Sequence, residues 1–211
     1  MIVFWGCFAM ILHCLLLCCS KHYNSYKTTE SKAEYICYVN STIHSALSAG
    51  LAVYAFYFTC EGWEQGATIL NSPTCLANPQ PIHYKIVFNT GSFLIYDLIL
   101  FGLIVKASGP LAKQTFAHHI LGSLSFYAVL FTGQVPVMYA IFGLFMELSN
   151  IFLFARWFFF EHGMADKPLV HSPVHLLNSA CLFLTYLVFR VIFHSYISFT
   201  IAYPVTWEYF V

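Results

Sequence analysis

The chain has 211 residues, of which 59% are hydrophobic, 19% aromatic and only 9% charged. Soluble domains carry about 25% charged residues, so this composition excludes an ordinary soluble domain and indicates an integral membrane protein. Lys and Arg together number 9, as do Asp and Glu, which gives a formal net charge of zero. Because proteins bind nucleic acid through an excess of positive charge, nucleic acid is excluded as a partner.

Six apolar segments approach the length needed to cross a bilayer, which is about 20 residues at about 1.5 Å per residue. In chain order they are residues 2–19, 36–59, 86–105, 116–132, 135–160 and 174–203. The fourth is short and the sixth is long, which predicts tilt or an interfacial turn. Glycines within the segments favour close helix packing; they are Gly91, Gly102, Gly122 and Gly143. We predict an all-α fold, a polytopic transmembrane helical bundle of about six spans.

The first segment differs from a cleaved signal peptide. Residues 1–20 contain no Lys or Arg and therefore lack the basic region at the start of such a signal. We expect a retained helix, so residues 1–35 form a leading transmembrane helix and a basic loop. Residues 36–203 then form the main helical bundle, and residues 204–211 form a short C-terminal tail.

The loops differ in positive charge. The odd-numbered loops and their flanks carry Lys21, Lys27, Lys32, Lys106, Lys113 and Lys167. The second loop has only Lys85, and the fourth has no Lys or Arg. Since Lys and Arg accumulate on the cytoplasmic side, the odd loops face the cytosol, or the matrix if the membrane is mitochondrial. Both termini are then expected on the opposite side.

Two cysteines, Cys60 and Cys75, lie around the second loop. The predicted topology puts this loop on the side that is oxidising in a secretory compartment. Two cysteines near one loop do not determine their own pairing, so a disulfide and two free thiols both remain open. Cysteine and histidine in zinc-binding spacing are absent from the sequence, and no metal site is predicted.

Ionisable residues inside the apolar segments are the candidates for function, because such groups are costly in hydrocarbon and usually have a task. Asp97 lies in the third segment and needs a partner, for which an imidazole of the next segment, His118 or His119, is suited. Adjacent residues on a helix point about 100° apart, so the two histidines do not aim at one point. His118, His119 and Asp97 are the catalytic candidates; the alternative is a set of structural hydrogen bonds.

The fifth segment carries a second group. Glu147 and Asn150 are three residues apart and share one helix face. Arg156 lies about 13 Å beyond Glu147 along the helix axis. There it either meets a lipid phosphate or anchors the helix beside Trp157. Lipid binding and helix packing are both open for these residues, and we take Glu147, Asn150 and Arg156 as lipid-binding candidates.

Two further lipid-binding candidates lie in other segments. Arg190 is surrounded by apolar residues and needs an acidic or lipid-phosphate partner, with Glu147 or Asp97 as candidates. His194 is four residues on and on the same face, so it could extend this network. His44 lies in the second segment, where a hydrogen bond to another helix is the alternative to lipid contact.

Several of these residues occur in short motifs that resemble those of one family. The motifs are Val-Asn-Ser-Thr-Ile-His-Ser-Ala at 39–46, Gly-Ser-Phe-Leu-Ile-Tyr-Asp-Leu at 91–98, His118-His119, the stretch from Glu147 to Arg156-Trp157, and Asn178 followed by Phe-Arg-Val-Ile-Phe at 189–193. In this order they are similar to the TLC domain (TRAM, LAG and CLN homology), shared by translocation-associated membrane proteins, ceramide synthases and several small lipid-linked proteins. The resemblance covers about three quarters of the chain.

The sequence departs from this family near its C-terminus. Members usually have a further helix after the one that carries the equivalent of Arg190, whereas this sequence ends at Val211. The resemblance therefore implies that either the final helix is missing or the sixth segment breaks into two pieces. An open flank would be filled by lipid or by a partner subunit.

The resemblance implies a role with lipids. In ceramide synthases the histidine pair is implicated in acyl transfer from acyl-coenzyme A to a sphingoid amine, and a neutral imidazole suits proton removal from that amine. The stretch after His119 lacks the acidic residues of those enzymes. Our main expectation is an integral membrane protein that binds or handles an amphipathic lipid in a polar-lined intramembrane pocket.

Two alternatives remain: a structural TLC-fold subunit of a larger membrane complex without turnover, and an acyl-CoA-dependent N-acyltransferase of the ceramide-synthase type. The sequence does not decide whether the protein is an enzyme. No cofactor is expected, and acyl-CoA enters only as a co-substrate of an acyltransferase. Membrane lipids and other membrane subunits are the expected partners. The expected location is an intracellular membrane, the endoplasmic reticulum by family default or the mitochondrial inner membrane as the alternative.

Overall fold

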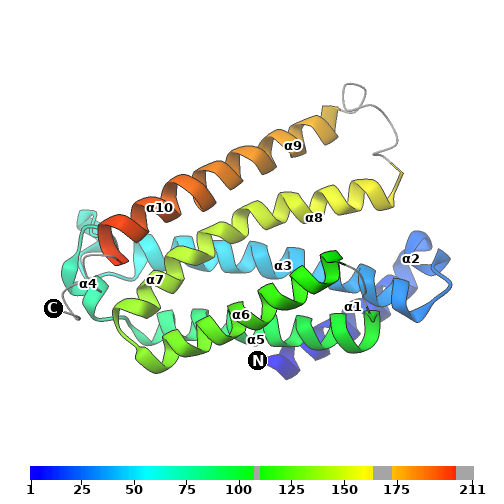
Figure 1. Cartoon of the computed structure of the whole chain (residues 1–211), viewed down its shortest axis with the longest axis horizontal. Helices are drawn as coiled ribbons and strands as arrows, with labels where there is room; N and C mark the ends of the chain where they lie inside the picture. Colours follow the sequence, from blue (N-terminus) through cyan, green and yellow to red (C-terminus); the bar gives the residue numbers. More distant parts are fainter. Residues whose placement is uncertain (107–109, 164–172, 203–211) are drawn as a thin grey trace. The chain divides into compact units, whose positions relative to one another are not determined.

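The computed structural model describes residues 1–106, 110–163 and 173–202 (Figure 1). Within these ranges all regular structure is helical, which confirms the all-α class. The predicted tail 204–211, Tyr203 at the end of the sixth segment, and Lys167 in the fifth loop lie outside the described residues.

Each of the six predicted segments is helical. Four stretches are long and apolar enough to cross a membrane, namely Ile2–Cys19, Pro81–Val105, Val135–Glu161 and Pro173–Thr200. Phe116–Thr132 is a shorter apolar helix. The remaining segment lies in α3 (Thr29–Phe58), whose 30 residues exceed the length needed to span a bilayer. Its hydropathy is reduced by a set of buried polar residues, Asn40, Ser41, His44, Ser45 and Ser48.

Helix α3 begins seven residues before the predicted start at residue 36. The side chain of Thr28 accepts a hydrogen bond from the Ser31 backbone N–H at 3.1 Å, as expected of a helix N-cap. Glu30 in the first turn interacts favourably with the positive end of the helix dipole. Residues 29–35 are therefore helical, although a loop was predicted there. In contrast, α1 (Ile2–Cys19) has the bounds that the sequence predicted.

The chain divides into two compact units. Unit 1 comprises Met1–His44 and Val87–Thr132, and unit 2 comprises Ser45–Ile86 and Gly133–Val211. Both α3 and α5 (Pro81–Ile99) contribute residues to each unit. The units therefore interleave in the sequence.

The core of unit 1 joins its first helix to two later ones. Trp5 of α1 packs with Cys37 of α3 and with Phe93 and Tyr96 of α5. Leu100 completes this core and opens η2 (Leu100–Val105), a π-helical continuation of α5. The helix α2 (Lys21–Ser25) follows α1 and is capped by the side chain of Ser20, which accepts from the Tyr23 N–H.

Glycines bring α5 close to α6 (Pro110–Thr132) in unit 1. A Cβ atom on Gly91 would lie 3.3 Å from Cβ of Phe126, and one on Gly122 would lie 3.0 Å from a methyl group of Leu94. These distances leave little room for a side chain, so the predicted role of glycine in helix packing is confirmed at both positions. Around Gly143, in unit 2, no atom of the described residues lies within 4 Å of such a Cβ.

In unit 2, helical residues run continuously through α7 (Val135–Gly143), η3 (Leu144–Met146) and α8 (Glu147–Glu161). The sixth segment forms α9 (Pro173–Thr185), the π-helical η5 (Tyr186–Phe193), α10 (His194–Ile197) and η6 (Ser198–Ala202). Its described residues therefore form one helical stretch without a break into two pieces.

Helices α8 and α9 lie side by side in unit 2 (Figure 1). The side chain of Asn178 on α9 donates a hydrogen bond to the carbonyl oxygen of Phe152 on α8, at 3.0 Å. Further along, the hydroxyl of Tyr139 on α7 lies 3.2 Å from Nε2 of His194 and 2.9 Å from Oγ of Ser198. These polar contacts hold the last helical segment to α7 and α8.

The second loop belongs to unit 2 and contains η1 (Trp63–Gln65) and α4 (Pro73–Ala77). Cys60 and Cys75 form a disulfide, with a Cα–Cα distance of 5.4 Å, which answers the question that the sequence left open. Thr59 Oγ1 also lies 2.7 Å from Nε2 of His83. The disulfide thus closes the second loop covalently. The contact between Thr59 and His83 joins the end of α3 to the start of α5.

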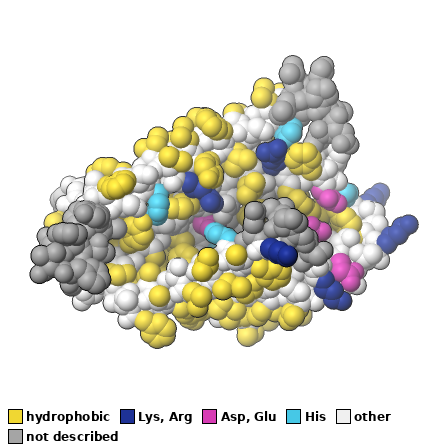
Figure 2. Space-filling model, in the orientation of Figure 1, with side chains coloured by type: hydrophobic (Ala, Val, Ile, Leu, Met, Phe, Trp, Pro, Cys, Tyr) yellow, Lys and Arg dark blue, Asp and Glu magenta, His cyan; other side chains and the backbone are white. Residues whose placement is uncertain are grey.

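The surface is largely hydrophobic. Figure 2 shows apolar side chains spread along the helices on the visible face, with few charged side chains among them. Among the large exposed side chains are Phe131 at 89%, Phe199 at 75% and Leu103 at 71% of their accessible area. A soluble monomer rarely exposes so much apolar surface, whereas lipid-facing helices do.

Candidate functional site

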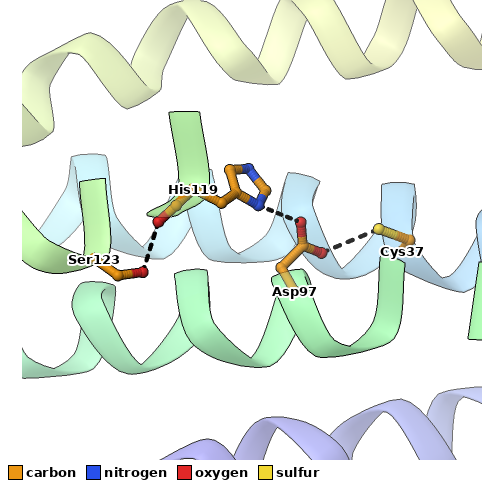
Figure 3. A network of polar contacts seen from close by, with 4 residues as sticks. All are labelled: Cys37, Asp97, His119 and Ser123. Atoms are coloured by element: carbon orange, nitrogen blue, oxygen red, sulfur yellow. Dashed lines mark hydrogen bonds and ion pairs between the residues drawn. The ribbon is translucent and has the colours of Figure 1, made fainter. Parts of the chain in front are cut away.

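A polar contact network lies inside unit 1, where Asp97 on α5 is placed between Cys37 on α3 and His119 on α6 (Figure 3). The Cys37 thiol donates a hydrogen bond to Asp97 Oδ1 at 3.0 Å. His119 Nδ1 lies 3.2 Å from Asp97 Oδ2, within ion-pair distance but without the alignment of a hydrogen bond. The expected contact between Asp97 and an imidazole of the next segment is therefore confirmed.

The two adjacent histidines occupy different environments. The His119 side chain is 14% exposed, and the Ser123 hydroxyl donates to its carbonyl oxygen at 2.7 Å (Figure 3). His118 is exposed, with its ring centroid 5.6 Å from that of His119. As the helical geometry predicts, the two rings are not directed at the same point. Of the two, only His119 contacts Asp97.

The Asp97–His119 contact influences which ring nitrogen of His119 carries the proton. A carboxylate beside Nδ1 favours the tautomer that carries its proton there, which leaves Nε2 as an acceptor. In this state the ring can remove a proton from an amine or hydroxyl, or accept a hydrogen bond from a lipid head group. The Cys37 thiol occupies the other carboxylate oxygen and so helps to orient Asp97.

His44, a predicted lipid-binding residue, is enclosed by aromatic side chains in unit 1. Its ring stacks on Phe93 with centroids 3.8 Å apart and an interplanar angle of 8°, and Trp5 contacts it edge-on at 5.3 Å. Only 2% of the residue is exposed. Because this burial separates the imidazole from bulk lipid, the position favours helix packing over direct lipid contact.

A second polar network lies in unit 2. Glu147 Oε2 accepts hydrogen bonds from Ser45 Oγ at 2.7 Å and from Asn150 Nδ2 at 2.9 Å. Arg190 Nη2 donates to Asn150 Oδ1 at 2.5 Å, and Arg190 Nε donates to Ser149 Oγ at 2.8 Å. Asn150 therefore links Arg190 to Glu147.

This arrangement bears on one of the two predicted partners of Arg190, the carboxylate, and leaves the lipid phosphate as a prediction. Instead of a carboxylate, its hydrogen-bond acceptors among the described residues are neutral oxygens of Ser149 and Asn150. The amide of Asn150 can donate and accept at once, so it occupies the place where a direct Arg190–Glu147 ion pair was expected. His194 contacts Tyr139 rather than extending this network.

Each unit contains a cavity: the one in unit 1 has a volume of about 480 Å³, and the one in unit 2, of about 360 Å³, adjoins the Arg190 network. The unit 2 cavity has polar lining residues, Ser149, Asn150, Arg156, Ser179 and Arg190, and apolar ones, Leu153, Leu182, Phe183 and Tyr186. Three predicted lipid-binding residues, Asn150, Arg156 and Arg190, thus line one cavity, with Glu147 hydrogen-bonded to the first of them.

Aromatic rings accompany both arginines. The Arg190 guanidinium lies 5.5 Å from the ring centroid of Tyr186, and that of Arg156 lies 5.5 Å from the ring centroid of Phe160. These are cation–π distances. The sequence left open whether Arg156 meets a lipid phosphate or anchors the helix beside Trp157; in the structure its guanidinium contacts the ring of Phe160, one helical turn after Arg156.

Sequence reasoning missed several contributors to both networks, above all Cys37, Ser45 and Ser149. Cys37, Ser41, His44, Ser45 and Ser48 recur at spacings of three and four along α3. This polar stripe within an apolar helix was a usable signal, since residues at these spacings share one face. No comparable pattern pointed to Ser149.

Another buried histidine of unit 2 lies outside both networks. His175 is only 5% exposed and lies near the rings of Phe159 and Phe160. The ring centroids are 5.8 Å and 5.9 Å from that of His175.

Comparison with known proteins identifies one family. The family model of the TLC domain matches residues 38–210. A search of curated proteins gave no match, and a search of solved structures gave none either. The family match begins within α3, so α1 and α2 precede it. Since the match spans most of the sequence, and apolar helices of membrane-spanning length lie within it, the chain is an integral membrane protein that belongs to the TLC domain family.

Proposed function

We propose that this protein binds an amphipathic lipid with an anionic head group in the cavity of unit 2. The observation that carries the proposal is the lining of this cavity, which combines two arginines with an apolar wall. Guanidinium groups bind phosphate and carboxylate through paired, charge-assisted hydrogen bonds. An acyl chain would lie against Leu153, Leu182 and Phe183.

The hydrogen bonds of Arg190 support this proposal. A guanidinium has five N–H donors, and the described contacts use one at Nε and one at Nη2. Both acceptors are neutral, so the positive charge of Arg190 has no direct carboxylate partner within the described residues. A charge in an apolar environment is costly unless it is paired. An anionic head group would lower that cost.

The location of the cavity also favours a lipid over a water-soluble ligand. Its walls are formed by α8, α9 and η5, within the two last candidate membrane spans. Phe183, which lines the cavity, is 66% exposed on a surface that is expected to face lipid. A lipid could therefore enter from the bilayer without crossing the interface.

The test is native mass spectrometry of the full-length protein in a mild detergent, with added phosphatidic acid or phosphatidylcholine of the same acyl composition. We expect phosphatidic acid to bind preferentially, and Arg190→Gln to weaken binding about tenfold, since one charged hydrogen bond contributes about 1.5 kcal/mol or more. Arg156→Gln should weaken it as well. Lys85→Gln removes an exposed cation of unit 2 outside the cavity lining and should leave binding unchanged.

Equal binding of both lipids, or no effect of Arg190→Gln, would contradict the proposal. Stable co-purification with other membrane proteins, together with unchanged lipid content in the Arg190→Gln variant, would instead support the structural-subunit alternative. Retention of the folded state by each variant is checked by gel filtration in the same detergent.

The Asp97–His119 contact favours a second candidate function, N-acyl transfer from acyl-CoA to a sphingoid amine. In this reaction His119 Nε2 would take the amine proton while the nitrogen attacks the thioester carbonyl, and the coenzyme A thiolate would leave and be protonated. Membranes that contain the full-length protein are assayed with palmitoyl-CoA and sphinganine. Activity that His119→Ala abolishes and His118→Ala largely retains would support this candidate, and absence of activity in the wild type would exclude it for these substrates.

A further inference from the structure

Unit 1 contains a larger cavity, of about 480 Å³, that none of the predicted site residues line. It lies between α1, α2, the start of α3 and the end of α5 with η2. Its volume falls within the range of about 300–1,000 Å³ that small-molecule sites occupy. Because α1 and α2 precede the family match at residues 38–210, this cavity depends on a part of the chain outside the matched domain.

One end of the cavity is polar. His13 Nδ1 lies 2.6 Å from the hydroxyl of Tyr23, and the ammonium group of Lys32 lies 5.8 Å from the centroid of the Tyr23 ring. Thr29 lines the same region. Burial raises the pKa of Tyr23 to about 12, so its hydroxyl stays neutral near pH 7 and does not neutralise Lys32. Lys32 has no salt bridge to any residue in the described part of the chain.

The rest of the cavity is apolar. It is lined mainly by small or aliphatic side chains, among them Gly6, Ala9, Met10, Ile36, Leu100 and Ile104. From His13 to Gly6 the helix α1 advances by seven residues, or about 10 Å at 1.5 Å per residue. A Cβ atom built on Gly6 would meet no atom within 4 Å among the described residues. The space beside Gly6 is therefore open to an alkyl chain.

The two ends lie in the order that a membrane lipid requires. Tyr23, Thr29 and Lys32 belong to the connection that follows α1 and to the first turns of α3, at the end of a candidate membrane span. Gly6 and Ala9 lie within that span. A head group at Lys32 would therefore be near the interface, and a chain beside Gly6 would lie within the hydrocarbon.

We propose that this cavity binds a single-chain amphiphile with a carboxylate head group, that is, a long-chain fatty acid. The carboxylate meets the ammonium group of Lys32 and accepts hydrogen bonds from Thr29 and from the Tyr23–His13 pair. One lysine matches a head group with a single negative charge, whereas the two arginines of the unit 2 cavity suit a phosphate. This inference is independent of the proposed function, because the two cavities share no lining residue.

The test uses photoreactive palmitate, with a diazirine in its chain, on the full-length protein in mild detergent. Labelled peptides are identified by mass spectrometry. We expect labelling of α1 and of the first turns of α3, reduced at least about fivefold by Lys32→Gln, a change of about 1 kcal/mol in binding free energy. Lys32→Arg should restore labelling. Lys27→Gln, which removes an exposed lysine of the same connection outside the cavity lining, should have no effect.

A second pair of variants tests the apolar part. Gly6→Leu fills the open space beside α1 and should reduce labelling to a similar extent. Gly50→Leu is the matched control, since a Cβ on Gly50 likewise meets nothing within 4 Å among the described residues and Gly50 does not line the cavity. Both changes replace a helical glycine, so both raise helix propensity by a similar amount.

Three results would overturn the proposal. Unchanged labelling in both Lys32→Gln and Gly6→Leu would show that the fatty acid binds elsewhere. Equal labelling by the diazirine alcohol of the same chain length would show that the carboxylate is not recognised. Displacement by phosphatidic acid but not by palmitate would assign the cavity to a phospholipid. Labelling should persist in Arg190→Gln, which keeps a failure here separate from a failure of the proposed function.

Discussion

Replacement of Asn150 by alanine tests the polar network of unit 2. Asn150 accepts a hydrogen bond from the Arg190 guanidinium at 2.5 Å and donates one to the Glu147 carboxylate at 2.9 Å. Asn150→Ala removes both and leaves two charged groups that have each lost a partner. A hydrogen bond to a charged group contributes about 1.5–3 kcal/mol, whereas measured polar contacts between membrane helices average about 0.6 kcal/mol.

Two such bonds to charged partners lead us to expect a loss of about 3 kcal/mol in the free energy of unfolding. The expected loss is smaller than twice the upper limit for one hydrogen bond to a charged group. The reason is that Arg190 and Glu147 can move toward each other once Asn150 is gone. The assay is reversible unfolding of the full-length protein by sodium dodecyl sulfate in mixed micelles, followed by tryptophan fluorescence. Asn24→Ala serves as the control, since it removes the hydrogen bond that this exposed side chain donates to the neutral Leu17 carbonyl oxygen and should cost about 1 kcal/mol or less.

The double variant Asn150→Ala with Glu147→Gln completes the test. If Asn150 links the two charges, removal of the carboxylate should make the loss of Asn150 less costly, with a coupling energy of about 0.5 kcal/mol or more. A single-variant loss below about 0.5 kcal/mol, or strict additivity in the double variant, would refute the described network.

Three further predictions concern stability. Cys60→Ser should lower the free energy of unfolding by about 3 kcal/mol, because the disulfide to Cys75 closes a segment with a sequence separation of 15. Reduction of the wild type should give the same loss. Reduction of Cys60→Ser, which lacks this disulfide, is the control. Gly91→Val should cost about 1–3 kcal/mol through crowding against α6, whereas Gly143→Val should not, and equal losses in the two variants would contradict the close approach of α5 and α6. Burial raises the pKa of Tyr23 from 10.0 to about 12, so the neutral Tyr23 side chain contributes fully to stability below pH 10, and this contribution is lost as the pH rises toward 12. Tyr23→Phe should remove this part of the pH dependence of the free energy of unfolding. The same alkaline pH dependence in wild type and variant would refute the prediction.

The two polar networks offer different chemistry. In unit 1 a carboxylate oxygen lies 3.2 Å from an imidazole nitrogen, an arrangement suited to proton transfer. In unit 2 an arginine is held by neutral acceptors beside an apolar wall, an arrangement suited to an anionic head group. The assays above therefore separate lipid binding from catalysis, because Arg190→Gln and His119→Ala alter residues of different networks.

The sequence alone determined the helical class, the order of the segments and several ends. Apolar stretches of about 20 residues cross a bilayer only as helices, because backbone groups cannot remain unpaired in hydrocarbon. That constraint predicted α1 with its observed bounds. It did not predict the start of α3, where Thr28 caps a polar first turn that hydropathy cannot distinguish from a loop.

The sequence also predicted that Asp97 contacts an imidazole of the next segment, since consecutive segments joined by a short loop are antiparallel and adjacent; the structure shows that this imidazole is His119 and not His118. Other partners depended on the rotation of each helix about its own axis. That rotation follows from side-chain packing between helices, such as the close approach at Gly91 and Gly122, and not from the periodicity of one segment.

Tertiary structure therefore decided that Asn150 and Ser149 accept from Arg190, for which the sequence predicted a carboxylate or a lipid phosphate. It also placed Cys37 against Asp97, although 60 residues separate them in the chain. A sequence pattern shows which side chains share a helix face, but contacts across helices require the packed arrangement of several faces, and only the folded chain supplies it.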